Sequence, residues 1–160
     1  MNIFRALIIC ITILLPASHI RAAENDSSKC TASCAALKAK LATLDCNSAL
    51  AEISSLLISN KSIVLEFPEA IRKQRNSVAE FEASVAVASR VTQNCLVKNA
   101  KSKSPLINVL VTINAFHYYV SHWLNEAPKV PLALEKQYHD RLIRGHTKAI
   151  EAISIVRQGI

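Results

Sequence analysis

Scarcity of glycine is the feature that most limits what this chain can fold into. Only Gly145 and Gly159 occur among its 160 residues. Tight hairpin turns, β-bulges and phosphate-cradling loops depend on glycine, so a sheet-rich fold and a nucleotide-binding loop are both disfavoured. Alanine, leucine, lysine and glutamate, which favour helices, are plentiful. The sequence therefore predicts an all-α fold.

The N-terminus has the pattern of a secretory signal peptide. Arg5 precedes an uncharged run over residues 6–15 that is apolar except for Thr12, and Ala22 ends a passable cleavage site. A run of about ten apolar residues is too short to span a bilayer. We therefore expect residues 1–22 to be removed, residues 23–160 to form a single domain, and the protein to be secreted or periplasmic.

The cysteine count agrees with an oxidising compartment. Once Cys10 is lost with the signal peptide, an even number remains: Cys30, Cys34, Cys46 and Cys95. Four cysteines in an exported protein usually form two disulfides, for which three pairings exist. The sequence thus predicts a disulfide-stapled domain.

An antiparallel hairpin would decide the pairing. If the segments on either side of residues 60–67 fold back on each other, with a turn near residue 64, facing residues have numbers that sum to about 128. Cys95 would then face Cys34 or, as a second choice, Cys30. We predict the bond between Cys34 and Cys95.

The apolar stripe of the first helical segment slips near residues 45–48. Its residues recur three and four apart on both sides of the slip: Cys30, Cys34, Leu37, Leu41 and Leu44, then Cys46, Leu50, Ile53 and Leu57. Either the helix kinks there or a second helix begins. A kink would let Cys46 meet the remaining N-terminal cysteine. A bond between Cys46 and Cys95 would instead imply a separate helix over residues 47–60.

The clearest pattern runs over residues 69–100, after a link at residues 60–62 and a helix-starting Pro68. Two interleaved series recur there every seven positions: Ile71, Val78, Val85 and Thr92, with Gln74, Phe81, Ala88 and Cys95. Such a heptad seam is typical of a helix packed in a bundle. Phe81 lies at its middle, where we expect a buried ring.

The segment 106–125 contains no Asp, Glu, Lys or Arg, and its apolar residues fall on all sides. A helix of this kind is buried among other helices or in a bilayer. Asn108, Asn114, His117 and His122 make a bilayer costly. The pattern therefore favours a central buried helix and no transmembrane helix in the mature chain.

Pro128 and Pro131 separate this segment from a last helix with its own apolar stripe. Gly145 falls on that stripe and is expected to allow close contact between helices. Helical segments joined by short links favour antiparallel neighbours. The sequence thus predicts an antiparallel (up-down) four-helix bundle whose first helix is kinked or broken near residues 45–48.

Signatures of catalysis are missing. A phosphate-binding loop, a Gly-x-Ser-x-Gly elbow and a dinucleotide fingerprint all need glycines that this chain lacks. No Cys-x-x-Cys-His haem motif and no His-Glu-x-x-His zinc motif occur. Three residues separate Cys30 from Cys34, not the two of a thioredoxin-like pair. We expect a non-enzymatic protein without a cofactor.

The histidines do not pair as metal ligands on one helix. His139 and His146 share a face but lie about 10 Å apart along the axis, and His117 and His122 point about 140° apart. A metal would need ligands from several helices. Partly buried histidines that bond to backbone or water are the simpler expectation.

Aromatic residues cluster in the second half of the charge-free segment. Phe116, Tyr119 and Trp123 share one face at helical spacing, which predicts core packing. Tyr118 and His122 form a more polar line beside them. If that line is exposed, it resembles the rigid aromatic anchors of protein interfaces.

Basic residues gather at two places: Arg72, Lys73 and Arg75, and again Lys98, Lys101 and Lys103. Loss of Arg5 and Arg21 leaves 17 of the 19 basic residues against 12 acidic ones, a net charge of +5. The two tracts lack interleaved aromatic residues, so we expect no nucleic acid and favour an acidic envelope or cell surface as the partner. A solvated helix face is the simpler explanation of the same residues.

Two functions follow from these patterns. The disulfides, the basic surface and the missing catalytic signatures favour an exported helical protein that binds another protein or an envelope or cell surface, as an adaptor, inhibitor or effector. The alternative is a small-ligand or metal carrier that uses histidines between helices, namely His117, His122, His139 and His146. Asn25 and Asn60 match the glycosylation acceptor pattern, which matters only in a eukaryotic secretory pathway.

Overall fold

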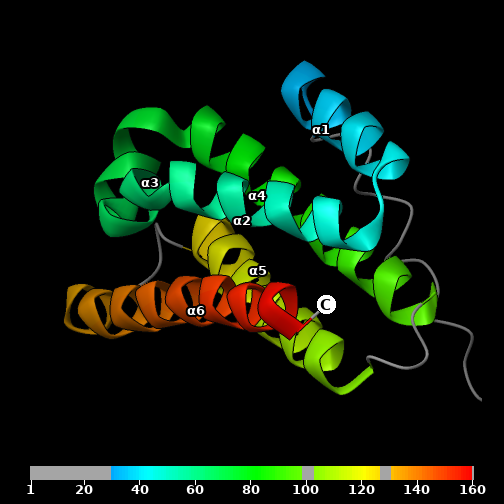
Figure 1. Ribbon diagram of the computed structural model, residues 1–160. Helices are drawn as coiled ribbons and strands as arrows, with labels where there is room; N and C mark the ends of the chain where they lie inside the picture. Colours follow the sequence, from blue (N-terminus) through cyan, green and yellow to red (C-terminus); the bar gives the residue numbers. More distant parts are fainter. Residues whose placement is uncertain (1–29, 99–102, 127–130, 160) are drawn as a thin grey trace, which may run out of the picture.

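The computed structural model describes residues 30–98, 103–126 and 131–159. Within these ranges the chain forms helices and no strands (Figure 1): α1 (Ala32–Thr43), α2 (Cys46–Ser59), α3 (Lys61–Leu65), α4 (Phe67–Lys98), α5 (Lys103–Glu126) and α6 (Leu132–Gly159). The prediction of an all-α fold is therefore confirmed. The predicted signal peptide (residues 1–22), the acceptor Asn25 and the basic Lys101 lie outside the described residues.

The first helical segment is broken, not kinked. α1 ends at Thr43, Leu44 has an extended backbone with ψ of 149°, and α2 begins at Cys46. The Asp45 carboxylate accepts hydrogen bonds from the Ser48 N–H at 3.0 Å and from the Ser48 hydroxyl at 2.7 Å. The bond from the Ser48 backbone is the main reason that the pKa of Asp45 is lowered. This cap satisfies a free N–H of the first turn, so a new helix starts here.

The disulfides are Cys30–Cys34 and Cys46–Cys95, with Cα–Cα distances of 5.3 and 5.5 Å. The predicted bond of Cys95 to Cys34, or to Cys30, is therefore wrong. That prediction assumed one continuous helix before the turn, whereas the chain turns between α1 and α2 and brings Cys46 against α4. The separate second helix that a Cys46–Cys95 bond implies is α2.

α1 runs parallel to α4, contrary to the predicted up-down order. Thr31, just before α1, donates a hydrogen bond to the Glu80 carboxylate, and Cys46, just after α1, is bonded to Cys95. Both pairs are 49 residues apart, so residue numbers rise together along the two helices. The hydrogen bond from Thr31 is the first cause of a lowered pKa of Glu80.

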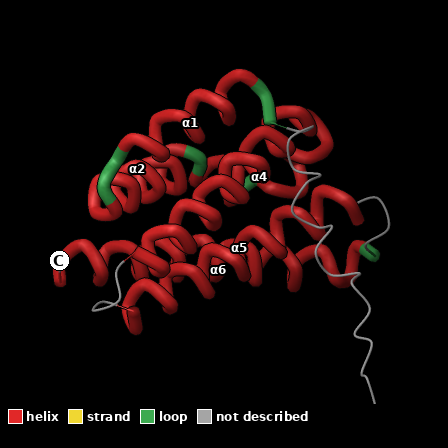
Figure 2. The backbone as a smooth tube through the Cα atoms, turned by 90° about the vertical axis from the view of Figure 1, so that its right-hand side faces the viewer, coloured by secondary structure: helices red, strands yellow, loops and turns green. Residues whose placement is uncertain are grey.

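The other long helices run antiparallel to their neighbours. Residue numbers rise on one helix as they fall on the other in the pairs that join α4 to α5 and α6 to the α2–α3 segment: Glu82–His117, Arg75–Leu124, Leu57–His146 and Val64–His139. Figure 2 shows α5 and α6 together on one side of α4, with α1 on the opposite side.

α4 is the helix at the centre of the fold. Every side chain from Phe81 to Ala88 is buried, because α1, α2 and α5 pack around this stretch. Small side chains at Ala83, Ser84 and Ala86 let the neighbouring helices approach closely. The segment that is buried on all sides therefore belongs to α4.

The predicted heptad seam of α4 is buried at seven of its eight positions. Gln74 is the exception and is exposed. Its backbone leaves the helical region, with φ of −136° and ψ of 43°, so α4 kinks there and the Gln74 side chain turns away from the core. Local backbone geometry, which heptad spacing does not report, explains this difference.

α5 is buried on one side only, so the prediction of a central helix buried all round is half wrong. Its core-facing residues pack against α4 and α6, but Ile107, Val111 and Tyr118 are 47%, 58% and 61% exposed. The apolar residues on all sides of this segment reflect a core face and an outer face, not burial on every side. Among the described residues, no helix is long and apolar enough to cross a membrane.

Gly145 marks the close contact between α5 and α6. A Cβ atom at Gly145 would lie 3.5 Å from the Cα of Phe116, so the two backbones nearly touch, as the sequence predicts. Phe116 also makes edge contacts with Phe81 of α4 and with His146 of α6, at ring distances of 6.0 and 5.4 Å. These rings join three helices in one core.

Candidate functional site

Three stacked rings bridge α5 and α6 at the surface. The His122 ring lies 5.7 Å from Tyr118 at an interplanar angle of 9°, and 5.8 Å from Tyr138 at 30°. Tyr118 is the exposed end of this stack. The candidate interface residues Tyr118 and His122 therefore lie together, and the structure adds Tyr138, which the sequence places on the apolar stripe of the last helix.

Buried aromatic residues hold this stack in place from below. Trp123 is buried and makes edge contacts with Tyr138 at 6.3 Å, with His139 at 5.9 Å and with Phe67 at 5.5 Å. Phe67 opens α4, so the support joins three helices. His122 is the ring that is packed on both faces, by Tyr118 and Tyr138, and the buried rings support the Tyr138 end of the stack.

Two exposed aliphatic residues of α5, Ile107 and Val111, extend the surface of the stack beyond Tyr118. Ile107, Val111 and Tyr118 follow one another four and seven positions apart, so they share one side of the helix over about 16 Å. No charged residue occurs between residues 106 and 125 to interrupt this line. We call the five residues of this surface the outer strip: Ile107, Val111, Tyr118, His122 and Tyr138.

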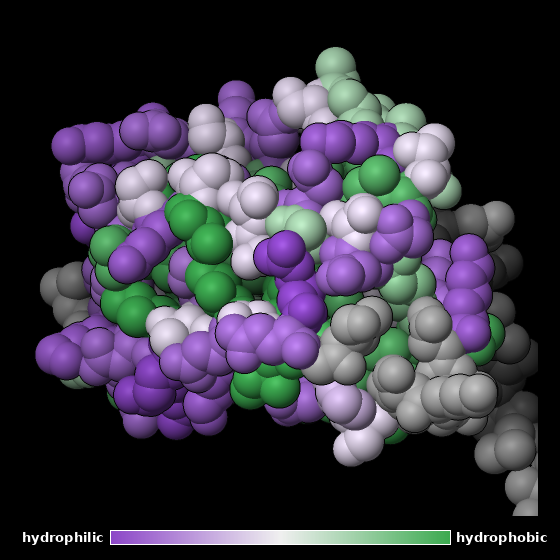
Figure 3. Space-filling view, in the orientation of Figure 1, coloured by the Kyte–Doolittle hydropathy of each residue, from purple (hydrophilic) through white to green (hydrophobic). Residues whose placement is uncertain are grey.

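Apolar residues reach the surface elsewhere as well. The face shown in Figure 3 is mainly hydrophilic over α6, with a smaller hydrophobic area near the junction of α2 and α3, where Ile58 and Leu65 are exposed. Scattered apolar residues are normal on protein surfaces, whereas an aligned and uncharged set is a mark of an interaction site.

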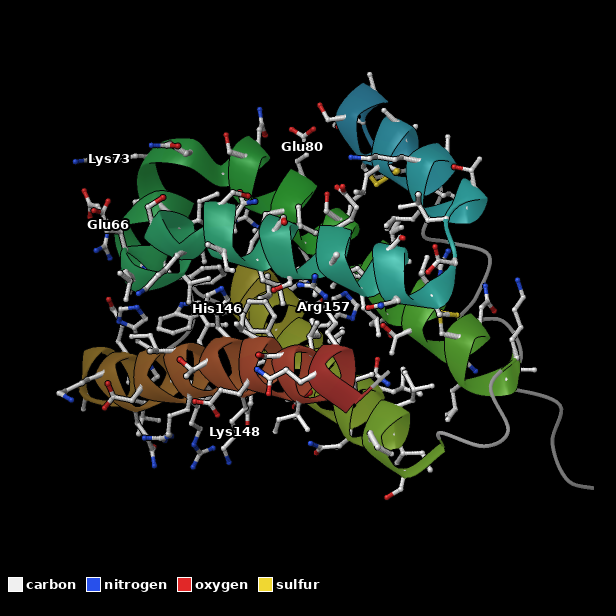
Figure 4. All side chains as sticks on the ribbon, in the orientation of Figure 1. Glu66, Lys73, Glu80, His146, Lys148 and Arg157 are labelled. Carbon is white, nitrogen blue, oxygen red and sulfur yellow. A yellow bond between two sulfur atoms is a disulfide. The ribbon has the colours of Figure 1, made fainter. Side chains whose placement is uncertain are left out.

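His146 and His139 connect α6 to the opposite layer. His146 is buried, and its Nε2 lies 2.8 Å from the Leu57 carbonyl oxygen; His139 Nε2 lies 2.9 Å from the Val64 carbonyl oxygen. Figure 4 shows His146 between α6 and α2. A carbonyl oxygen only accepts, so Nε2 is the donor in both hydrogen bonds. Burial is the main reason that the pKa of His146 is lowered.

His117 connects α5 to α4. Its Nε2 lies 2.8 Å from Oε1 of Glu82, whose side chain is buried in the central stretch of α4. The four histidines thus make four separate contacts: a carboxylate, two backbone carbonyls and an aromatic stack. No group of three or more His, Cys, Asp or Glu side chains that could hold a metal occurs within the described ranges. The histidines that the sequence proposes as a ligand set are not brought together.

The first basic cluster makes contacts within the protein. Lys73 and Arg72 pair with Glu69 at 2.9 and 3.0 Å, and Arg75 donates to the Leu124 carbonyl oxygen near the end of α5 at 2.7 Å. The hydrogen bond between Lys73 and Glu69 is the main reason that the pKa of Glu69 is lowered and the pKa of Lys73 is raised. These contacts occupy side chains that the sequence offers to an acidic surface.

The second basic cluster is described only in part. Lys98 ends α4 and is exposed, and Lys103 begins α5.

Asn60, the second glycosylation acceptor, caps α2 and donates from its side-chain amide to the Leu56 carbonyl oxygen at 2.9 Å. A sugar on that amide nitrogen would compete with this hydrogen bond.

Sequence reasoning missed Ile107 and Val111. The sequence did carry a signal for them. A helix that is apolar on every side needs a neighbouring helix on every side, and a short chain has too few helices to supply them.

Comparisons with protein families, curated proteins and solved structures found no match to this chain.

Proposed function

We propose that this is an exported, non-catalytic helical protein that binds another protein through the outer strip. The observation that carries the proposal is the alignment of exposed Ile107, Val111 and Tyr118 within a stretch of α5, residues 106–125, that contains no charged residue. Exposed apolar surface lowers the free energy of the complex when a partner removes it from water.

The form of the strip supports a protein partner. Tyrosine contributes large contact area with few rotatable bonds, and it is enriched among the residues that dominate binding energy. Tyr118 stacks on His122, His122 stacks on Tyr138, and buried Trp123 packs against Tyr138. This support reduces the side-chain entropy that Tyr118 loses on docking. An uncharged, elongated strip best suits an apolar groove or an amphipathic helix on the partner.

The titratable residues support a non-catalytic role. His117, His139 and His146 each bond to another element of the same chain, and His122 lies between two tyrosine rings. Such contacts position helices. The net positive charge expected for the mature chain would speed encounter with an acidic partner, while the strip itself supplies the contact.

Site-specific photo-crosslinking in the native host tests this function. A photoreactive residue is placed at position 111 or 118 on the strip, and at Ala39 of α1 or Glu151 of α6 as exposed controls. Both strip positions should give the same adduct with a second protein, and the controls should not. An adduct only at twice the mass of the chain, or equal labelling from all four positions, would contradict the proposal.

A further inference from the structure

A groove of about 400 Å³ opens between α1, α2 and α4, away from the outer strip. Its floor is apolar and includes Leu41, Ala49, Val87 and Val91. The volume falls within the range of sites for small ligands, about 300–1,000 Å³. The groove is therefore large enough for a ligand that the outer strip does not explain.

The fold itself creates this space. The break at Leu44 lets α2 leave α1, and the small side chains of Ala42 and Ala49 leave room against α4. The disulfide Cys46–Cys95 lines the groove and ties α2 to α4. Because a covalent bond fixes this wall, the groove is not a gap that can close freely.

The rim of the groove is basic. Lys38 comes from α1, and Arg90 and Lys98 come from α4, whereas no Asp or Glu is among the described residues that line the groove. Lys38 and Lys98 are exposed, and neither has an ion pair with any described carboxylate. An apolar floor under a basic rim is complementary to a molecule with an apolar chain and an anionic end.

We propose that this groove binds a long-chain carboxylate, with its alkyl chain on the floor and its carboxylate at the basic rim, beside Lys38 toward one end or Lys98 toward the other. Burial of the chain supplies the apolar contribution, and the ammonium group donates charge-assisted hydrogen bonds to the carboxylate oxygens. The volume lies near the lower end of the ligand range, which favours one chain over the two chains of a phospholipid. The site is independent of the proposed protein partner, because the outer strip lies on α5 and α6.

Calorimetric titration of the mature, oxidised protein tests the ligand class. The probes are dodecanoate, dodecanol and dodecyltrimethylammonium, which share one chain and differ in charge, each kept below its micelle concentration. Dodecanoate should bind saturably and one to one. Dodecanol should bind at least about tenfold more weakly, and the cation should not bind. No saturable heat with dodecanoate, or equal affinity for dodecanoate and dodecanol, would overturn the proposal.

Variants locate the site. Lys38→Gln combined with Lys98→Gln should weaken dodecanoate binding about tenfold or more. Lys61→Gln combined with Lys148→Gln removes the same charge elsewhere, since neither residue lines the groove, and Figure 4 shows Lys148 on the side of α6 that faces away from α2. This control should bind as the unchanged protein does. Equal binding by both pairs would place the ligand elsewhere.

A third variant tests the floor without changing charge. Ala42 is exposed and lines the groove, so Ala42→Trp should fill it while leaving the buried core intact. Loss of dodecanoate binding with an unchanged unfolding midpoint supports the site. Undiminished binding by Ala42→Trp would refute it.

Discussion

Cys46 is bonded to Cys95, and this bond fixes the first residue of α2 against the last turns of α4. The bond joins residues 49 positions apart, whereas Cys30 and Cys34 are separated by only four. Since a cross-link stabilises chiefly by restricting the unfolded chain, the two disulfides should contribute very differently.

Removal of Cys46–Cys95 by paired serine substitutions should lower the free energy of unfolding by about 4 kcal/mol, as the loop-entropy relation gives for a loop of this size. Removal of Cys30–Cys34 should cost about 2 kcal/mol. Denaturant unfolding of both variants measures the difference. Equal losses would show that loop closure is not what the long-range disulfide contributes.

Phe81→Ala should be severely destabilising. Phe81 is buried in the stretch of α4 that helices surround on all sides, and it contacts the Phe116 ring. Loss of a buried phenyl ring typically costs about 3–5 kcal/mol. Val97→Ala, at a position that is 77% exposed on the same helix, serves as the control and should change stability by less than about 0.5 kcal/mol. Similar denaturation midpoints would refute a buried seam.

Gly145→Ala should be neutral or stabilising. The added Cβ meets the Cα of Phe116 at 3.5 Å, an ordinary contact distance, and alanine favours the helix by about 0.5–1 kcal/mol. Gly145→Leu carries more atoms into the same contact and should cost about 1–3 kcal/mol. Thermal melting of both variants decides it. If the alanine variant were as unstable as the leucine variant, the space at Gly145 would be too small even for the added Cβ, which contradicts its distance of 3.5 Å from the Cα of Phe116.

His146 should make stability depend on pH in one direction. Burial lowers the pKa of His146 below its ordinary 6.5, the nearby Lys61 adds to this effect, and the Leu57 hydrogen bond opposes it. Below pH 6.5 the unfolded chain binds a proton at His146, whereas the folded chain excludes this proton until the pH falls to its lower pKa. The contribution of neutral His146 is thus fully present above pH 6.5 and is lost as pH falls through the folded pKa.

The test compares the unchanged protein with His146→Gln, which does not titrate. Free energies of unfolding are measured at about pH 8 and about pH 5. The unchanged protein should lose more stability on acidification than the variant does. Equal losses would show that His146 takes up its proton equally in both states.

Local patterns predicted the elements of this fold. Glycine scarcity indicates helices throughout, Pro68 lies in the first turn of α4, and Asn60 ends α2. The heptad spacing identifies the buried side of α4 except at Gln74. These features depend on neighbouring residues, which a sequence displays directly.

The arrangement of the elements could not be predicted in the same way. The slip of the apolar stripe at residues 45–48 can reflect a kink or the start of a new helix, and the outcome depends on the cap at Asp45 and the extended backbone of Leu44. That one turn reverses the chain, makes α1 parallel to α4 and exchanges the partner of Cys95. Sequence spacing reports which side of a helix is apolar but not which neighbour covers it, and the exposure of Val111 went unpredicted for that reason.

The affinity of the crosslinked partner for strip variants tests the central claim most directly. The protein captured from position 118 is purified, and its dissociation constant is measured with the unchanged chain, Tyr118→Ala, Val111→Asp and the exposed control Val97→Asp. Tyr118→Ala and Val111→Asp should each weaken binding about 30-fold or more, as residues that dominate an interface do, and Val97→Asp should have no effect. Strip variants that bind as tightly as the Val97→Asp control would contradict the account.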